Sequence, residues 1–351
     1  MDQSGKSEFL PGFWYAALPS EELRRKGMRR QRLFGLPLLF VRDGSGAVHA
    51  LDDHCPHRGI PLSDGSFDGW EIECCYHGWR FSCSGQCTAI PSLTPDSSVN
   101  PGRIKVRTYE SAESDGLIWI YKRKSKEPLP PVPFLEKPSE NYTLQVLSRT
   151  MRCEMDHGII GLMDPAHGPF VHQAWWWRTG KSIHEKEKRF EPIDYGFRMS
   201  AHNPSSNSAA YKLLKIYGEP ITTTIDFVLP NRRIEKIRSG KFWYSSLAVV
   251  TPVDELETRL DFVAAWNVFR GVPFLKSIQR YFGSKFIDQD KRIMEKQAAG
   301  LRDRPNLMLI DGADTPAKWY FQLKNAYQKS VEEGTEFENP IHEPVTLRWR
   351  S

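Results

Sequence analysis

Two pairs of cysteine and histidine lie close together in the first quarter of the chain. Cys55 and His57 occur in the stretch CPHRG, and Cys74 and His77 occur in CCYHGWRF, after a gap of sixteen residues. Two thiolates and two imidazoles suit a tetrahedral zinc ion or an iron–sulfur centre with mixed ligands. Each pair supplies one sulfur and one nitrogen, which favours a two-iron centre with both cysteines on one iron and both histidines on the other. Cys75 is an alternative ligand, because Cys75-x-His77 repeats the spacing of the first pair.

The other thiols nearby have simpler interpretations. Cys83 and Cys87 are spaced like half of a zinc site, but the sequence offers no second pair to complete it. We expect both of them, and Cys153, to be packed thiols, and His54 to be a loop histidine. A structural zinc site is the rival interpretation for the main cluster.

A second set of metal-binding residue types occurs in GLMDPAHGPFVHQ, which contains Asp164, His167 and His172. Two histidines five residues apart point about 140° away from each other on an unbroken helix, so they do not share a face. Gly168 and Pro169 predict a break in the helix, and the break lets His172 lie beside His167. Two imidazoles and one carboxylate on one side of Fe(II) leave open positions for O2 and a substrate.

The carboxylate of such a site must come from elsewhere, and SKFIDQDKRIMEKQ offers Asp288, Asp290 and Glu295. Helical periodicity separates them, because Asp290 lies within an apolar stripe while Asp288 and Glu295 fall on the opposite face. That stripe consists of Phe286, Ile287, Ile293, Met294 and Gln297. A carboxylate that faces a core is paired or binds a metal. Asp290 is therefore the predicted third ligand, and a buried salt bridge is the alternative.

The elements that must position these residues differ between the two halves of the chain. Residues 12–123 read as short strands and turns, with a hairpin predicted around Asp43-Gly44-Ser45-Gly46. The proline-rich stretch KRKSKEPLPPVPF predicts an extended connector. Beyond it, strand-like alternation at 260–268 is mixed with helical spacing at 153–177 and 282–297. Strands flanked by helices without a βαβ rhythm predict an α+β fold.

Composition excludes several classes of function. The 351 residues are 40% hydrophobic and 26% charged, as in an ordinary globular protein, and the formal net charge is only +5. No basic block indicates nucleic-acid binding, and no apolar run approaches the roughly 20 residues that span a bilayer. The first residues do not resemble a secretory signal, and the crowded cysteines suit metal binding in a reducing compartment. We therefore expect a cytoplasmic protein that binds neither nucleic acid nor membrane.

The motif C-x-H followed by C-x-x-H-G-W resembles the Rieske domain of ring-hydroxylating oxygenases, and the likeness extends over residues 12–123. The resemblance implies that Cys55, His57, Cys74 and His77 hold a Rieske [2Fe–2S] cluster, with Cys75 filling a position that does not bind iron. It also implies an N-terminal all-β iron–sulfur domain and a C-terminal catalytic domain with an antiparallel sheet and helices (helix-grip, START-like). We place the first domain at 1–126, the linker at 127–138 and the second domain at 139–351.

The second motif, D-x-x-H-x4-H, resembles the catalytic domain of the same family. The resemblance implies mononuclear Fe(II) held by His167, His172 and Asp290. It also implies that Asp164 is a bridge, hydrogen-bonded to His167 and reaching a Rieske histidine of a neighbouring subunit; the alternative is a helix N-cap, because Asp-Pro often begins a helix. Relatives often have asparagine three residues before this aspartate, where this chain has Gly161.

The resemblance is strongest to oxygenases with a single type of oxygenase subunit, such as vanillate and dicamba demethylases and toluenesulfonate monooxygenase. It implies the terminal oxygenase of a multicomponent system, a homotrimer that hydroxylates or O- or N-dealkylates a small organic substrate. The sequence lacks a G-x-G-x-x-G nucleotide fingerprint, so we expect electrons from a ferredoxin or an NAD(P)H-dependent flavin reductase. The alternatives are a cis-dihydroxylating dioxygenase and, from another class, a Rieske electron carrier or a zinc-stabilised binding protein.

Overall fold

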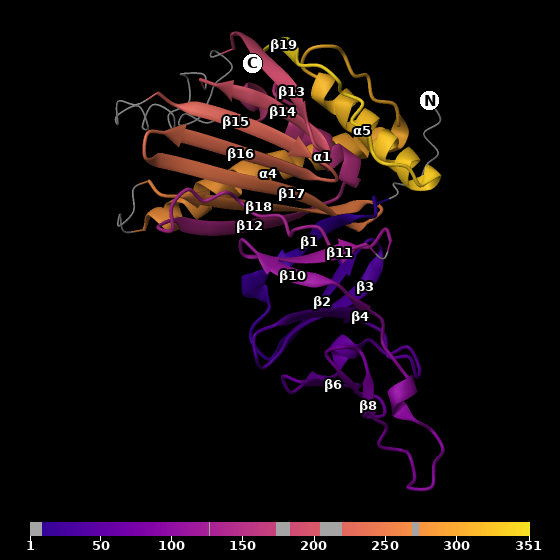
Figure 1. Cartoon of the computed structure of the whole chain (residues 1–351). Helices are drawn as coiled ribbons and strands as arrows, with labels where there is room; N and C mark the ends of the chain where they lie inside the picture. Colours follow the sequence, from indigo (N-terminus) through magenta and orange to yellow (C-terminus); the bar gives the residue numbers. More distant parts are fainter. Residues whose placement is uncertain (1–8, 126, 173–182, 204–219, 269–273) are drawn as a thin grey trace. The chain divides into compact units, whose positions relative to one another are not determined.

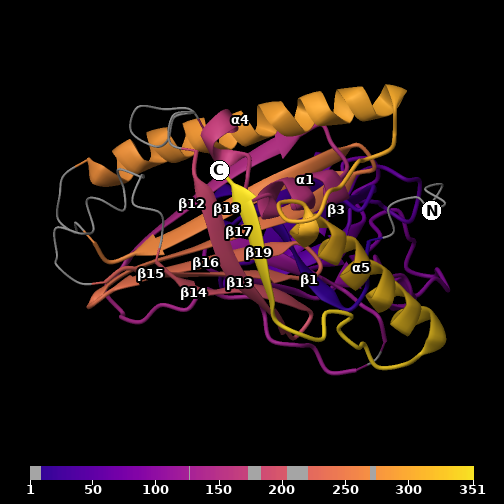
Figure 2. The ribbon, with the colours of Figure 1, turned by 90° about the horizontal axis from the view of Figure 1, so that it is seen from above.

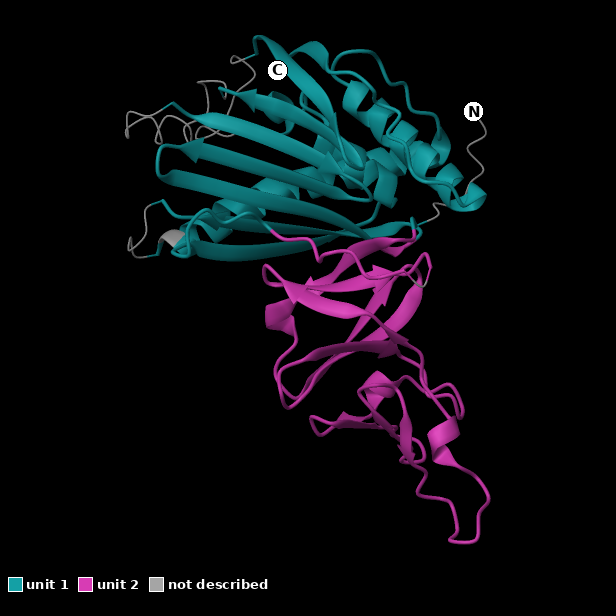
Figure 3. Cartoon of the chain, in the orientation of Figure 1, with its two compact units in different colours: residues 1–10, 135–251, 255–351 teal, residues 11–134, 252–254 magenta. Residues whose placement is uncertain are grey.

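The computed structural model divides the chain into two compact units (Figure 3). The first comprises residues 11–134 and 252–254, and the second comprises residues 1–10, 135–251 and 255–351. The structure describes residues 9–125, 127–172, 183–203, 220–268 and 274–351.

Strands and short 3-10 turns make up the first unit (Figure 1). Its strands form three antiparallel sheets, with the orders β1-β11-β10, β2-β3-β4-β9 and β5-β6-β7-β8. Their bounds are β1 Phe13–Pro19, β2 Gly27–Leu33, β3 Leu36–Arg42, β4 Val48–Asp52, β5 Ser66–Phe67, β6 Glu71–Glu73, β7 Arg80–Ser82, β8 Cys87–Ala89, β9 Thr108–Tyr109, β10 Ser111–Ser114 and β11 Leu117–Lys122. The prediction of an N-terminal all-β domain is confirmed.

The predicted hairpin around residues 43–46 joins β3 to β4. The Asp43 carboxylate closes this turn by accepting hydrogen bonds from the backbone N–H groups of Ser45, Gly46 and Ala47. A hydrogen bond from the Ser45 hydroxyl and another with His49 add to these and hold the pKa of Asp43 well below its usual value. Gly46 has φ +103°, a conformation that side chains disfavour, so the turn requires glycine there.

The second unit is built on one sheet whose strands follow the order β12-β18-β17-β16-β15-β14-β13-β19. The pairs β12/β18, β13/β14, β13/β19, β14/β15, β15/β16 and β16/β17 are antiparallel. The bounds are β12 Thr143–Met151, β13 Glu185–Ile193, β14 Gly196–His202, β15 Thr222–Val228, β16 Arg232–Ser239, β17 Phe242–Asp254, β18 Glu257–Trp266 and β19 Val345–Arg350.

Helices lie against this sheet: α1 (Met155–Met163), α2 (Gly168–Val171), α4 (Leu275–Asp303) and α5 (Thr315–Glu333). Helix α4 runs along β12, and α1 packs against α4, α5 and the sheet (Figure 2). At Gly283 of α4, an added Cβ would lie 2.8 Å from Leu147 of β12, which shows how closely helix and sheet approach. The α+β prediction is confirmed, and it rests on this sheet with helices packed against it.

Helix α4 is longer than the predicted 282–297, because it begins at Leu275 and ends at Asp303. The side chains of Phe274, Ile278 and Tyr281 repeat at helical spacing where α4 begins, but they are 79%, 48% and 60% exposed. The prediction began at residue 282 and left this exposed stripe out. Among the described residues, the structure contains no helix with the length and apolar character needed to cross a bilayer.

The division between the two units falls between residues 134 and 135, within the proline-rich segment. Before this point, the carbonyl of Pro130 accepts a hydrogen bond from the indole of Trp14 at 2.9 Å. After it, the Glu136 carboxylate pairs with Lys236 at 2.9 Å and Arg238 at 3.4 Å on β16. Each end of the segment is thus tied to its own unit.

A largely buried ion pair joins α1 to α5. The Asp156 carboxylate accepts hydrogen bonds from the Tyr320 hydroxyl and the Lys324 ammonium, both at 2.6 Å. The Asp156 and Lys324 side chains are only 16% and 10% exposed. Because the second metal-binding motif begins at the end of α1, this pair helps to hold that motif against the rest of the unit.

Replacing Asp156 with alanine is expected to lower the free energy of unfolding of the second unit by about 3 kcal/mol, because it leaves the Lys324 charge buried without a partner. The matched control is Asp311→Ala. Asp311 pairs with Lys318 at 2.7 Å but is 94% exposed, and exposed pairs contribute little. Urea unfolding followed by circular dichroism measures both. Equal loss in the two variants would contradict the prediction.

Candidate metal centres

The first candidate centre is formed by two loops with the same backbone hydrogen bonds. In one loop, the Cys55 N–H donates to the Ile60 carbonyl and the Gly59 N–H donates to the Cys55 carbonyl. In the other, the Cys74 N–H donates to the Trp79 carbonyl and the Gly78 N–H to the Cys74 carbonyl. Gly59 and Gly78 have φ +77° and +68°, which glycine adopts readily. The loops therefore match Cys55 with Cys74, and not with Cys75.

Burial separates the cysteines in the same way. Cys55 and Cys74 are 2% and 3% exposed and belong to the core cluster that contains Leu39 and Phe81, whereas Cys75 is exposed. The backbone thus presents Cys55 and Cys74 inward and leaves Cys75 at the surface. These positions favour Cys74 over Cys75 as the partner of Cys55.

The two histidines of these loops also lie together. The rings of His57 and His77 have centroids 4.6 Å apart, and His57 stacks on Trp79 with centroids 4.5 Å apart and planes 7° apart. Desolvation lowers the pKa of His57, and the nearby His77 lowers it further. The neutral imidazole that results is the form that binds a metal. The buried Nδ1 of His77 has no hydrogen-bond partner within the described residues.

The cysteine thiols of this centre are buried where their ionisation is unfavourable. Burial raises the pKa of Cys55 to about 11, and the adjacent Cys74 thiol adds to the rise, while backbone N–H groups of His57 and Arg58 oppose it. A metal-bound sulfur is a thiolate, so binding must outweigh the cost of placing that charge in the core. Two adjacent buried sulfurs, N–H groups directed at one of them and an orphaned imidazole nitrogen fit a two-iron cluster with mixed ligands.

The remaining cysteines do not join this centre. The thiols of Cys83 and Cys87 donate to the carbonyls of Trp70 at 3.4 Å and Ala89 at 3.7 Å. Cys153 is buried, and its carbonyl accepts a hydrogen bond from Thr258. Cys87 and Cys153 are buried and Cys83 is partly buried, in agreement with the prediction that all three are packed thiols.

The second candidate centre lies where α1 ends. The helix ends at Met163, a turn follows, and α2 begins at Gly168 with Pro169 in its first turn. The predicted helix break at Gly168-Pro169 is therefore wrong in position, because proline is well tolerated in the first turn, where its missing N–H is not needed. His167 and His172 instead flank the single turn of α2 as its N-cap and C-cap.

Hydrogen bonds direct both imidazoles towards the same point. Nδ1 of His167 lies 2.8 Å from the Asp164 carbonyl, and Nδ1 of His172 lies 3.0 Å from Oε1 of Gln289. An oxygen acceptor on each Nδ1 requires that this nitrogen carry the proton, which leaves the lone pair on Nε2. The two Nε2 atoms are 3.2 Å apart, so two lone pairs face each other.

Asp290 on α4 completes the group. Its Oδ1 lies 3.0 Å from Nε2 of His172 and 3.8 Å from Nε2 of His167. Among the described residues, these three form the group whose ligand atoms lie within 4.8 Å of one another. Within the described part of the chain, Asp290 contacts His167 and His172 and forms no ion pair with a lysine or an arginine, as a buried salt bridge would. Ligands about 2.1 Å from one ion and at right angles lie about 3 Å apart, so the set suits a facial two-histidine, one-carboxylate metal site.

The other two candidate carboxylates of α4 face elsewhere. Asp288 pairs with Arg149 of β12 at 2.6 Å, and Glu295 accepts a hydrogen bond from the Arg152 N–H at 3.2 Å. Neither belongs to the group with His167 and His172.

Two further residues support His172: Gln289, which the sequence did not single out, and Phe286, which the sequence placed only in the apolar stripe of the helix. Gln289 accepts its Nδ1–H, and Phe286 stacks on its ring with centroids 3.5 Å apart and planes 12° apart. Both precede Asp290 on α4, so one helix provides a predicted ligand and fixes the orientation of another. The sequence signal was weak, since a glutamine beside a core-facing aspartate has no distinctive spacing.

Asp164 is not a helix N-cap, and its role as a bridge between subunits stays a prediction. It is the C-cap of α1, so the N-cap interpretation is wrong, and its Oδ1 accepts the Ala166 N–H at 2.7 Å to form the turn before His167. Its main-chain oxygen is the close partner of His167, while its carboxylate Oδ2 lies 3.7 Å from Nδ1. The side chain is 36% exposed, so the carboxylate remains accessible to another group.

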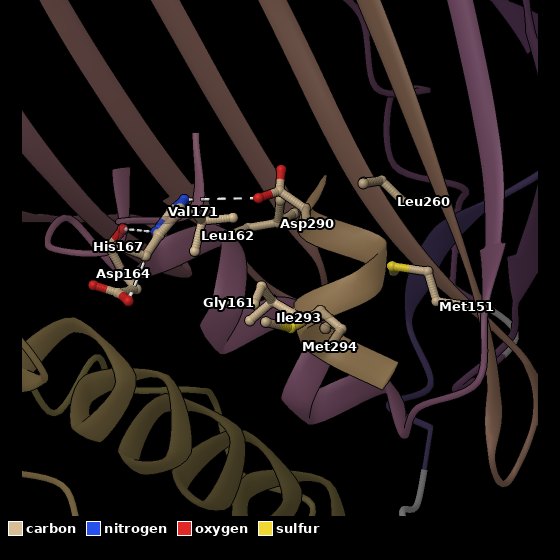
Figure 4. Close-up of a pocket in the computed structure, with 11 residues that line it drawn as sticks. Met151, Gly161, Leu162, Asp164, His167, Val171, Leu260, Asp290, Ile293 and Met294 are labelled. Atoms are coloured by element: carbon tan, nitrogen blue, oxygen red, sulfur yellow. Dashed lines mark hydrogen bonds and ion pairs between the residues drawn. The ribbon is translucent and has the colours of Figure 1, made fainter. Parts of the chain in front are cut away.

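A pocket opens beside His167 and Asp290 (Figure 4). It encloses about 420 Å³, including open solvent at its mouth. Apart from Asp164, His167 and Asp290, its lining is apolar: Met151, Gly158, Gly161, Leu162, Val171, Leu260, Ile293 and Met294. The thioether of Met294 occupies the space where a side chain at position 161 would begin.

Comparison with known proteins agrees with this division into two centres. Residues 13–110 match the Rieske [2Fe-2S] domain, and residues 152–319 match the vanillate O-demethylase oxygenase C-terminal domain. The chain therefore belongs to the Rieske-type oxygenases, a family of oxidoreductases whose cofactors are a [2Fe–2S] cluster and a mononuclear iron.

The curated proteins that resemble the chain carry names of different kinds. The chain is 26% identical to the chloroplast protein TIC 55 of Pisum sativum, over 89% of this chain and 55% of that protein. It is 30% identical to the 5,5'-dehydrodivanillate O-demethylase oxygenase subunit of a Sphingobium species, over 54% of this chain and 46% of that protein. The chain thus spans about half the length of these curated relatives.

Among solved structures, dicamba monooxygenase bound to dicamba has the same fold. The TM-score is 0.74 at 21% identity, and the match covers 93% of this chain and 99% of that one.

Exchanging cysteine for serine at positions 74 and 75 distinguishes the two adjacent thiols. Cys74→Ser is expected to remove the visible absorbance and the acid-labile sulfide of the cluster, because a buried ligand is lost. Cys75→Ser is the matched control and should retain both, since Cys75 is exposed. A cluster that survives in Cys74→Ser and disappears in Cys75→Ser would reverse the assignment.

Replacing Asp290 with alanine is expected to lower iron from about three to about two atoms per chain and to leave the visible spectrum unchanged, because only the mononuclear site loses a ligand. Asp288→Ala, two residues away on the same helix, should keep all of the iron, since it removes only a partly exposed pair with Arg149. Metal analysis beside the absorbance spectrum measures both. Equal iron loss in the two variants would contradict the assignment.

Proposed function

We propose that the chain is the terminal oxygenase of a multicomponent Rieske system and that it inserts oxygen from O2 into a small organic substrate. In this proposal Cys55, His57, Cys74 and His77 hold the [2Fe–2S] cluster, while His167, His172 and Asp290 hold the mononuclear iron. The observation that carries the proposal is the convergence of the last three side chains beside an apolar pocket. An electron carrier has no need of such a site.

The two groups, when bound, supply single electrons from the cluster and open coordination positions for O2 at the mononuclear iron. The protein's own contribution is to position and shield. The Asp164 carbonyl and Gln289 hold the protons of His167 and His172 on Nδ1, so that both Nε2 atoms stay available. The apolar lining excludes water from the space where the substrate would lie.

Asp164 is also proposed to link the two centres in a homotrimer, by hydrogen bonding to His77 of the partner subunit. One feature supports this role: the Asp164 carboxylate is 36% exposed and remains accessible to another group. A carboxylate between two imidazoles orients both rings. Electrons would come from a separate ferredoxin or NAD(P)H-dependent flavin reductase.

The proposed reaction is monooxygenation, as hydroxylation or as O- or N-dealkylation through an unstable hydroxylated carbon. The match of residues 152–319 to a demethylase oxygenase domain supports this choice, as does the named activity of the dehydrodivanillate relative. Among the described residues, the lining of the pocket is apolar apart from Asp164, His167 and Asp290, which supports an uncharged group as the part of the substrate that is oxidised.

The test is substrate-dependent O2 uptake by the iron-loaded protein with a surrogate reductase. Phenyl ethers, N-methyl compounds, arylsulfonates and substituted benzoates form the panel, and formaldehyde and hydroxylated products are measured. We expect product from at least one class, and none from Asp290→Ala with its cluster still reducible. A wild-type protein with both metals that is reduced but forms no product would favour the electron carrier, and a colourless protein containing zinc would overturn the Rieske assignment.

A further inference from the structure

Met294 and Gly161 meet at the wall of the pocket. Gly161 lies on α1 and Met294 on α4, and Figure 4 shows the sulfur of Met294 beside the glycine. A Cβ added to Gly161 would lie 2.5 Å from Sδ and 2.8 Å from Cε of Met294, closer than such contacts occur. The thioether therefore occupies the room that any larger residue at position 161 would need.

Met294 is also placed to meet whatever enters the pocket. It follows Asp290 by four residues on α4, so both side chains lie on the same face of the helix. Both line the pocket, as does Gly161. The side chain of methionine is unbranched and flexible. The tip of Met294 therefore limits the space beside Asp290 but can still adjust its position.

We propose that Met294, seated against Gly161, determines the length of the apolar group that the pocket accepts, and that this group is a short unbranched alkyl group such as the methyl of an ether or an amine. This inference rests on the proposed function, because it treats the pocket as the substrate site. Apart from Asp164, His167 and Asp290, the described side chains that line the pocket are apolar, so they select a substrate group by its size.

Alkyl phenyl ethers from methyl to hexyl test the inference by binding alone. Calorimetric titration of the protein with both metals, without O2 or reductant, measures the affinity for each ether. Each methylene that the pocket buries should raise affinity about fourfold, until the group reaches Met294 and the gain stops. In Met294→Ala, which removes the three heavy atoms beyond Cβ, the gain should continue for about three more carbons.

Met308→Ala is the matched control, because Met308 is 89% exposed and should leave the profile of wild type unchanged. Unchanged profiles in Met294→Ala, equal changes in both variants, or no binding of any ether would overturn the inference.

A double-mutant cycle tests the contact itself. Gly161→Ala must displace the Met294 tip, so we expect it to weaken binding of the ethers at least fivefold in the wild-type background. In the Met294→Ala background the tip of the side chain is absent, so Gly161→Ala should weaken binding of the ethers less than twofold. Effects of Gly161→Ala that are equal in the two backgrounds would show that the residues do not interact and would overturn the inference.

Turnover separates this inference from the proposed function. If binding follows the expected profiles but the wild type oxidises neither an ether nor any other class of the panel, the proposed function fails, and the assignment of Met294 as the wall of the pocket stands. If ethers are oxidised in an Asp290-dependent reaction but the profiles of Met294→Ala and wild type coincide, the function stands and the inference fails.

Discussion

Three atoms that carry lone pairs face one another at the centre of the second unit. Nε2 of His167, Nε2 of His172 and Oδ1 of Asp290 are separated by 3.0 to 3.8 Å. With both imidazoles protonated on Nδ1, a shared cation would make this arrangement favourable. The surrounding structure serves to hold it: α2 is a single turn between the histidines, α4 brings the carboxylate, and the Asp156 pair fixes α1 to α5.

The first unit must also hold metal-binding side chains close together, and it does so in a different way. There the backbone does most of the positioning, through two loops with matching hydrogen bonds and a left-handed glycine in each. The sulfurs are placed inside a core, where a thiolate is costly until a metal neutralises it. In the second unit, by contrast, side chains from separate elements converge, and the Nδ1–H groups of the two rings donate hydrogen bonds to the Asp164 carbonyl and to Oε1 of Gln289.

The pocket and the metal site share one helix face, which links selectivity to chemistry. Asp290 and Met294 lie one helical turn apart on that face of α4. Helix α1 contains Gly161, and the turn that leads to His167 follows its C-terminal end. A change in how α1 packs on α4 therefore alters ligand geometry and pocket size together. The close approach of the helices at Gly161 limits such movement, because protein interiors tolerate little change of volume.

Local patterns in the sequence were enough to predict the α+β fold, the all-β first domain, the residue types of both centres and the choice of Asp290, because ligand spacing and helical periodicity are properties of short segments. Tertiary structure alone decided the rest. Gln289 supports His172 across 117 residues of chain, and Met294 fills the space at Gly161 from a distant helix. Pro169 begins α2 instead of breaking a helix, because the chain had already left α1 at Met163. Such contacts depend on which elements pack together, and no short stretch of sequence carries that information.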